Sequence, residues 1–117
     1  MKRLLICAAI VFATTTAQAG ELMVSALQVK PKLKAGVPYT VTLPYEKTGE
    51  ANVRQGCFKW SGEGPYCFKP QGVTANKITV RLRTGNPNKY ELTGYIIYQA
   101  NGQMMHSNEV SASIDVR

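Results

Sequence analysis

GCFKWSGEGPYCF, residues 56 to 68, is the stretch that decides the fold. Cys57 and Cys67 lie symmetrically about Gly62, so two strands that fold back around this glycine bring the two cysteines opposite each other. Facing side chains of an antiparallel pair are close enough for a disulfide to form with little strain. The stretch therefore predicts a disulfide-linked β-hairpin. Because the closed loop is short, the bond should contribute about 2–3 kcal/mol in the loop-entropy model.

Side chains alternate between the two faces of a strand, which gives this hairpin two different sides. One side carries four aromatic rings, those of Phe58, Trp60, Tyr66 and Phe68. The other side carries the disulfide and Lys59. We expect the rings to pack in the core, because aromatic side chains are large contributors there. The alternative is a row of rings that stacks on sugars.

The first nineteen residues have the organisation of a secretory signal peptide. A positive start at Lys2-Arg3 precedes an apolar run over 4–13, and a small-residue cleavage site ends at Ala19. The apolar run is too short to span a bilayer. The sequence predicts a signal peptide at 1–19, one exported domain at 20–117, and a periplasmic or secreted location. A retained N-terminal anchor is the alternative.

The cysteine pattern agrees with export. Without the signal peptide, Cys57 and Cys67 are the only cysteines, and an even pair in a small exported domain is typical of a disulfide. Two free buried thiols are the alternative. Two cysteines and the distant, single His106 do not make a recognisable set of metal ligands.

The net charge of the mature chain is positive. Fourteen Lys and Arg, less Lys2 and Arg3, leave twelve against seven Asp and Glu, a net charge of +5. This charge favours acidic partners such as anionic lipid headgroups, polysaccharides or acidic proteins. A contribution to solubility alone is the alternative. Nucleic acid is not an expected partner, because no nucleic-acid-binding motif is present.

Alternating apolar residues predict about seven strands and no helix. The predicted strands are 22–29, 37–45, 53–60, 65–69, 78–83, 90–99 and 109–116, with a short edge strand around 72–74. The apolar phase changes between Ala26 and Leu27, which predicts a bulge or a strand that crosses from one sheet to the other. A type I′ turn at Asn101-Gly102 predicts a hairpin that needs a one-residue bulge at Ser107-Asn108.

This strand pattern resembles the immunoglobulin and fibronectin type III superfamily. Trp60 falls where the third strand of that fold has a core tryptophan, and the triplet beginning at Tyr90 resembles its tyrosine corner. Val41 and Leu92 stand where antibody domains have bridging cysteines, so this sequence departs from antibodies there. The resemblance implies an all-β, immunoglobulin-like antiparallel β-sandwich and indicates no particular family.

No catalytic signature is visible, so we expect no enzyme, no catalytic residue, no metal site and no cofactor. A nucleophile needs a base and an orienting group, and Ser107 is too close in sequence to His106 to form such an arrangement. The seven acidic residues are scattered and suggest no carboxylate pair.

Two surfaces are candidates for binding besides the aromatic rings. On the outer face of the sheet built from the third, sixth and seventh strands, Tyr95 and Ile97 should point outward beside Lys59. We name this the outer face and predict that it contacts a protein partner. The alternative is a patch covered by the chain itself.

The second surface is the basic row, formed by Lys77, Arg81 and Arg83 on the opposite sheet. It is predicted to meet an anionic partner. The alternative is a solvated strand face that protects a sheet edge from pairing.

Together these features predict a small exported, non-catalytic domain that binds a protein in the periplasm or at the cell surface. The first alternative is a module that binds carbohydrate or an anionic envelope polymer. The second is a subunit that completes an exposed edge strand of another copy or of a partner, which leaves self-association open.

Overall fold

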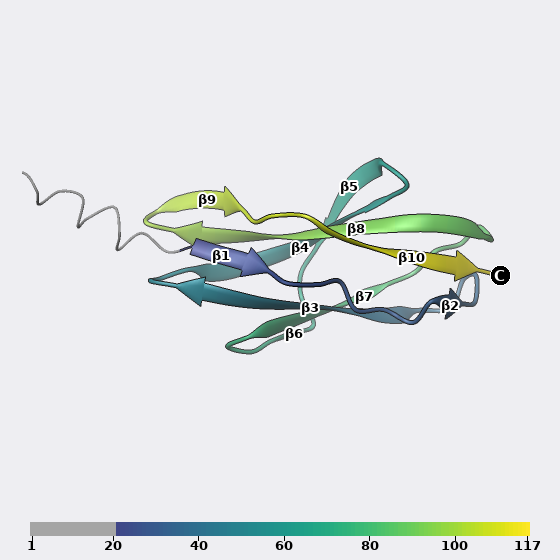
Figure 1. The fold of residues 1–117 in the computed structure, drawn as a ribbon, viewed down its shortest axis with the longest axis horizontal. Helices are drawn as coiled ribbons and strands as arrows, with labels where there is room; N and C mark the ends of the chain where they lie inside the picture. The colour runs from purple at the N-terminus through teal and green to yellow at the C-terminus, as the bar shows by residue number, and fades with distance from the viewer. Residues whose placement is uncertain (1–20) are drawn as a thin grey trace, which may run out of the picture.

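The fold is a sandwich of two β-sheets (Figure 1), seen in a computed structural model that describes residues 21–117. The predicted signal peptide at 1–19 lies outside the described residues. The strands are β1 (Glu21–Val24), β2 (Lys32–Leu33), β3 (Tyr39–Thr48), β4 (Asn52–Trp60), β5 (Glu63–Phe68), β6 (Gly72–Val73), β7 (Lys77–Leu82), β8 (Asn88–Ala100), β9 (Gln103–His106) and β10 (Val110–Val116).

The two sheets differ in size and strand order. One has four strands in the order β1-β3-β7-β6, and the other has the order β2-β10-β8-β4-β5, with β9 also paired to β8. All neighbouring strands are antiparallel except β2 and β10. This arrangement confirms the predicted all-β sandwich. The short β6 is the edge strand expected around 72–74.

The N-terminal segment crosses between the sheets, which is one of the two outcomes that the change of apolar phase predicts. β1 pairs with β3 in the four-stranded sheet, and β2 pairs with β10 in the six-stranded sheet. Between them, Gln28 still bridges to Thr42 of β3. Leu22 and Leu27 are both buried because the chain turns its other side inward as it crosses.

The β4–β5 hairpin has the predicted register and disulfide. Cys57 stands opposite Cys67, and their sulfur atoms are bonded. The two-residue turn at Ser61-Gly62 has positive φ at both positions, the geometry of a type I′ turn. Nearer the turn, Trp60 pairs with Glu63, so the register shifts by one residue on the way to the cysteines.

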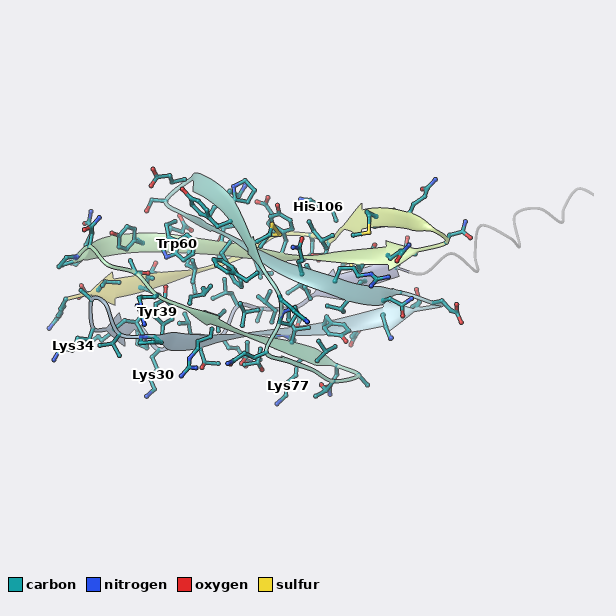
Figure 2. The ribbon with its side chains drawn as sticks, turned by 180° about the vertical axis from the view of Figure 1, so that it is seen from behind. Lys30, Lys34, Tyr39, Trp60, Lys77 and His106 are labelled. Carbon is teal, nitrogen blue, oxygen red and sulfur yellow. A yellow bond between two sulfur atoms is a disulfide. The ribbon has the colours of Figure 1, made fainter. Side chains whose placement is uncertain are left out.

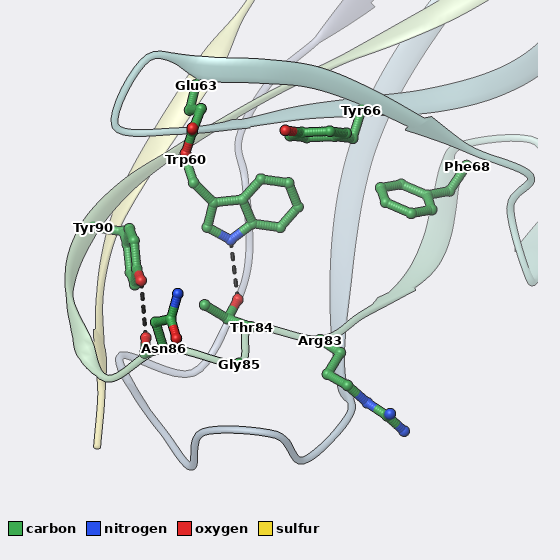
Figure 3. Close-up of a pocket in the computed structure, with 9 residues that line it drawn as sticks. All are labelled: Trp60, Glu63, Tyr66, Phe68, Arg83, Thr84, Gly85, Asn86 and Tyr90. Atoms are coloured by element: carbon green, nitrogen blue, oxygen red, sulfur yellow. Dashed lines mark hydrogen bonds between the residues drawn. The ribbon is translucent and has the colours of Figure 1, made fainter.

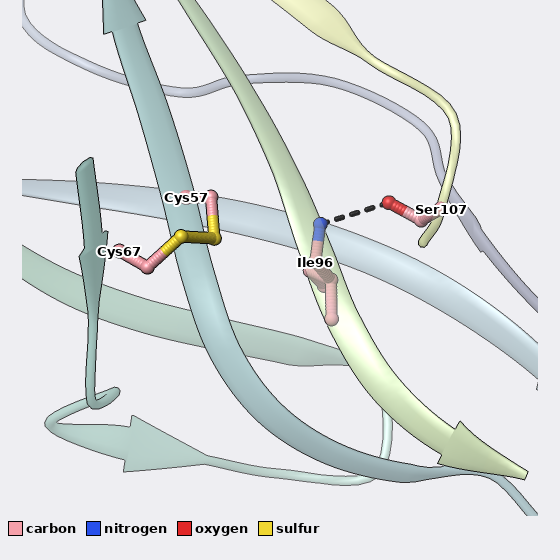
Figure 4. The surroundings of a disulfide bond; sticks show 4 residues. All are labelled: Cys57, Cys67, Ile96 and Ser107. Carbon is pink, nitrogen blue, oxygen red and sulfur yellow. Dashed lines mark hydrogen bonds between the residues drawn. A yellow bond between two sulfur atoms is a disulfide. The ribbon is translucent and has the colours of Figure 1, made fainter. Parts of the chain in front are cut away.

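The β8–β9 hairpin also has the predicted turn, because Asn101 and Gly102 both have positive φ. One residue is absorbed between β9 and β10, which confirms the expected bulge. Ser107 lies there and is buried. Its amide donates to the Ile96 carbonyl, and its Oγ accepts the Ile96 N–H at 2.8 Å (Figure 4).

The core lies between the sheets. Its buried apolar residues are Leu22, Val24, Leu27, Tyr39, Val41, Leu43, Tyr45, Ala51, Phe58, Ile78, Val80, Leu82, Leu92, Ile96, Tyr98, Ala100, Ile114 and Val116. In β7 and β8, the residues that point into this core alternate with residues that point outward. The predicted strand 37–45 begins later in the structure, because Val37 is 47% exposed in the loop before β3.

Candidate functional site

An open cleft lies beside the disulfide hairpin (Figure 3). We name it the aromatic cleft. Its volume is about 300 Å³, and its lining residues are Trp60, Glu63, Tyr66, Phe68, Arg83, Thr84, Gly85, Asn86 and Tyr90. Three of its rings come from the hairpin, the fourth comes from the start of β8, and the opposite wall is the loop between β7 and β8. Segments far apart in the sequence therefore build one site.

A buried hydrogen-bond network fixes the indole ring of Trp60. Its Nε1–H donates to Thr84 Oγ1 at 3.0 Å and lies 3.3 Å from the hydroxyl of Tyr39. The hydroxyls of Tyr39 and Thr84 are themselves 2.7 Å apart. Each of these residues lies in or beside a different strand, so the network holds one wall of the cleft at a fixed position.

The tyrosine corner fixes another wall. The Tyr90 hydroxyl donates to the Asn86 carbonyl at 2.8 Å, four residues upstream in the chain. This is the bond that the resemblance to immunoglobulin domains implies. It orients the Tyr90 ring along the cleft and stiffens the β7–β8 loop at the same time.

The hairpin rings divide between the core and the surface. Phe58 is fully buried, Trp60 and Phe68 are half-buried, and Tyr66 is 53% exposed. The prediction that all four rings pack in the core is therefore right for Phe58 and wrong for Tyr66. The reason is position, because β5 is the edge strand of its sheet and rises away from the four-stranded sheet (Figure 1).

The exposed rings do not form a flat platform. The Trp60 and Tyr66 rings have centroids 6.0 Å apart and planes inclined at 59°. At this separation and inclination the two rings are in aromatic contact, so together they form one angled apolar wall of the cleft. The aromatic cleft therefore offers an angled apolar wall and not a flat aromatic face.

The outer face is closed at its centre, so the prediction that Tyr95 is exposed is wrong. Tyr95 is only 5% exposed. The imidazole ring of His106, in β9, stacks on the Tyr95 ring at a centroid distance of 4.0 Å with an interplanar angle of 22°. On the other flank, Tyr95 is paired with Cys57 of the disulfide. The alternative of a patch covered by the chain itself describes this tyrosine correctly.

The other two residues of the outer face are half-buried. Ile97 pairs with His106 on β9, and Lys59 forms an ion pair with Glu109 at 3.0 Å. The sequence contained a signal for this cover. The Asn101-Gly102 hairpin already places His106 opposite Ile97, on the same face as Tyr95.

The basic row is exposed. Lys77 and Arg81 project outward from β7, where Ile78 and Val80 point into the core, and Arg83 continues the same side. Within residues 21–117, neither ion pair of the protein involves these three side chains. None of these three charges is therefore neutralised by a carboxylate of the described residues.

Sequence reasoning missed half of the aromatic cleft. Thr84 and Asn86 lie between the predicted strands 78–83 and 90–99, so the strand pattern indicated only a connection there. Their contribution depends on how close this loop lies to the hairpin in space. The tyrosine corner at Tyr90 was the one available signal, because its bond brings the start of β8 back over the loop.

The described residues include one buried hydroxyl with a raised pKa and no cluster of metal-ligating side chains. Burial raises the pKa of the Tyr45 hydroxyl above its usual value, and this hydroxyl donates to the Thr74 carbonyl. Within residues 21–117, no group of three or more His, Cys, Asp or Glu is placed to hold a metal ion. In the same range, no helix is long and apolar enough to cross a membrane.

No family model matches the chain, and no curated protein sequence does so either. Among solved structures, the chain is similar to the CARDB domain of a Pyrococcus furiosus protein in complex with di-metal ions, at 9% identity and a TM-score of 0.54. That match covers 85% of this chain and 94% of the other. The chain is also similar to a cohesin module from a Clostridium perfringens family 33 glycoside hydrolase, at 12% identity and a TM-score of 0.52, covering 86% of this chain and 98% of that one. At such identities the likeness concerns the fold, and it shows an immunoglobulin-like β-sandwich.

Proposed function

We propose that this chain is an exported, non-catalytic domain that binds another protein in the periplasm or at the cell surface through the aromatic cleft. The observation that carries the proposal is a half-exposed Tyr66 beside a Trp60 whose indole is held in place by hydrogen bonds. Residues that dominate binding energy at protein interfaces are enriched in Trp, Tyr and Arg and are held rigidly. Arg83 supplies the third residue type at the rim of the cleft.

The edge strand β5 supports a peptide-like partner. It ends the six-stranded sheet, so among residues 21–117 no strand pairs with one side of its backbone. An extended segment of a partner can pair with such an edge while alternate side chains enter an adjacent pocket. Because Tyr66 and Phe68 line the cleft from β5, pairing and side-chain insertion would occur at the same place.

Export is supported by two features. The first is the signal-like sequence at 1–19, and the second is the disulfide between Cys57 and Cys67. Disulfides persist in oxidising compartments such as the periplasm and the extracellular space.

The test is site-specific photocrosslinking in the native envelope, with the crosslinking residue at position 66, 97 or 81. These positions report separately on the aromatic cleft, the outer face and the basic row. We expect a discrete protein adduct from position 66. Tyr66→Phe, crosslinked from position 63, should keep the adduct because the ring remains, and Tyr66→Ser should lose it. An adduct from position 97 alone would move the contact to the outer face and contradict the cleft.

The basic row favours a second candidate function, the binding of an anionic envelope polymer or carbohydrate. Lys77, Arg81 and Arg83 are exposed on one side of β7 and make no ion pair within the described residues. Retention on an immobilised acidic polysaccharide should fall with salt, and it should fall further when all three are replaced with glutamine. Retention that is unchanged both by salt and by the triple substitution would exclude this role for the basic row.

A further inference from the structure

A second pocket, lined by lysines, lies where the chain crosses between the sheets. Its volume is about 370 Å³, within the range of small-molecule sites. Its lining residues are Lys30, Lys32, Leu33, Lys34, Val37, Pro38, Tyr39 and Thr40. We name it the lysine pocket. Figure 2 shows Lys30 and Lys34 projecting on one side of Tyr39, with Trp60 on the other side, so the lysine pocket and the aromatic cleft are separate sites.

The backbone that carries the lysines is held firmly. The amide of Asp115 donates to the Pro31 carbonyl at 2.7 Å, and the amide of Arg117 donates to the Leu33 carbonyl at 2.9 Å. The amide of Ala35 donates to the Arg117 carbonyl at 2.8 Å. This parallel pairing with β10 fixes the segment, while Lys30, Lys32 and Lys34 remain exposed.

The lining of the pocket carries a net positive charge. Its lining contains three lysines and no acidic residue. Asp115 is the register partner of Lys32, but its carboxylate accepts from Arg117 Nη2 at 3.0 Å and from Nε at 3.2 Å. Within residues 21–117 none of the three lysines is in an ion pair. Arg81, which pairs with Thr40 at the rim, adds positive potential from the neighbouring strand.

We propose that the lysine pocket binds a phosphate group, as a monoester or diester, carried by a lipid headgroup or by a soluble phosphorylated compound. Lysine ammonium groups act as point charges on flexible stems, so several of them can surround a tetrahedral phosphate and donate to its oxygens. The lining has three lysines and no arginine. Val37 and Pro38 offer an apolar wall to the organic part of the ligand.

This inference does not rest on the proposed protein contact. The test uses a triple variant of the pocket, Lys30→Gln, Lys32→Gln and Lys34→Gln. The matched control is Lys47→Gln, Lys69→Gln and Lys89→Gln, which removes the same charge from exposed lysines outside both the pocket and the basic row. Because all six side chains are exposed, we expect both variants to fold, which thermal unfolding will check. Single changes at Lys30 and Lys34, which lie outside the strands, provide a second route.

Three probes distinguish the sources of phosphate. They are vesicles of phosphatidylcholine with and without phosphatidylglycerol, soluble glycerophosphate measured by calorimetry, and a carboxylate polymer such as alginate. We expect binding to the anionic vesicles to weaken about a hundredfold in the pocket variant, from roughly a fivefold effect per lysine, and to change much less in the control. Glycerophosphate binding that is lost in the pocket variant would support the site with a soluble ligand.

Three results would overturn the proposal. The first is that the protein binds neither the anionic vesicles nor glycerophosphate. The second is that vesicle binding weakens equally in the pocket variant and in the control variant. The third is tighter binding to alginate than to the two phosphate probes. The pocket variant should also keep the crosslink from position 66. Failure of the pocket therefore remains distinguishable from failure of the aromatic cleft.

Discussion

Replacing Gly94 with alanine should destabilise the sandwich at the point where the disulfide hairpin packs on β8. Gly94 is buried and pairs with Phe58, which is fully buried. A Cβ at position 94 would lie 2.8 Å from Cε1 and 3.0 Å from Cδ1 of the Phe58 ring, and 3.1 Å from Leu27 Cδ1. Contacts under about 3 Å are repulsive, and neither neighbour can move into solvent.

The size of the effect follows from this overpacking. Inserting a methyl group into a well-packed core costs about 1–3 kcal/mol. For a domain of this size, each kcal/mol lowers Tm by about 4–8 °C. Gly72→Ala is the matched control, because a Cβ there meets nothing within 4 Å. We expect Gly72→Ala to change stability by less than about 1 kcal/mol.

The assay is urea unfolding followed by the fluorescence of Trp60, the single tryptophan of the chain. Gly94→Ala should lower the midpoint without changing the m-value. Combining Gly94→Ala with Phe58→Leu should relieve the steric clash. The double variant should then be about 0.5–3 kcal/mol more stable than the sum of the two single effects predicts. Gly94→Ala with wild-type stability, or strict additivity with Phe58→Leu, would refute the packing argument.

Three further predictions concern stability. Replacing Cys57 and Cys67 with alanine should lower the free energy of unfolding by roughly 3 kcal/mol, because the bond joins positions separated by 10 residues; equal urea midpoints for variant and oxidised wild type would contradict this. Asn108→Ala removes two hydrogen bonds of 2.8 Å, one from the Val24 N–H and one to the Val24 carbonyl. The free energy of unfolding should therefore fall by about 1–2 kcal/mol, and the Val24 amide hydrogen should exchange faster with solvent. Unchanged hydrogen exchange would argue against this link between the sheets. Burial raises the pKa of the Tyr45 hydroxyl, so the contribution of the protonated hydroxyl to stability is complete below about pH 10 and is lost as the pH rises above that value. Tyr45→Phe should therefore make Tm fall less steeply with pH in alkali. An unchanged slope of Tm against pH would contradict this role of Tyr45.

Much of the fold was predictable because its causes are local. The hairpin register depends on two cysteines placed symmetrically about Gly62, and the disulfide follows from it. The bulge near Ser107 follows because an uninterrupted hairpin from the tight turn would place Val110 on the outer face of the sheet, whereas its apolar side chain belongs on the core face. Each of these inferences uses residues close together in the chain and the period of two along a strand.

The functional surfaces were harder to predict, because exposure depends on what lies across from a residue. Tyr95 and Tyr66 show this in opposite directions. Tyr95 points away from the core yet is covered by His106, whereas Tyr66 belongs to the ring side of the hairpin yet stands free at a sheet edge. Alternation assigns a face to a residue, and it does not say whether that face is covered.

The amino-acid sequence by itself determined most of the strands, the two hairpin turns and the disulfide, and it left a bulge and a crossing between the sheets as alternatives for the first segment. These depend on backbone preferences and side-chain alternation over a few residues. Only the tertiary structure decided that the Lys30–Lys34 segment encloses a pocket and that Trp60 and Tyr90 face one cleft. The physical reason is that these sites join segments distant in the chain, whose positions are set by the packing of two sheets around a common core.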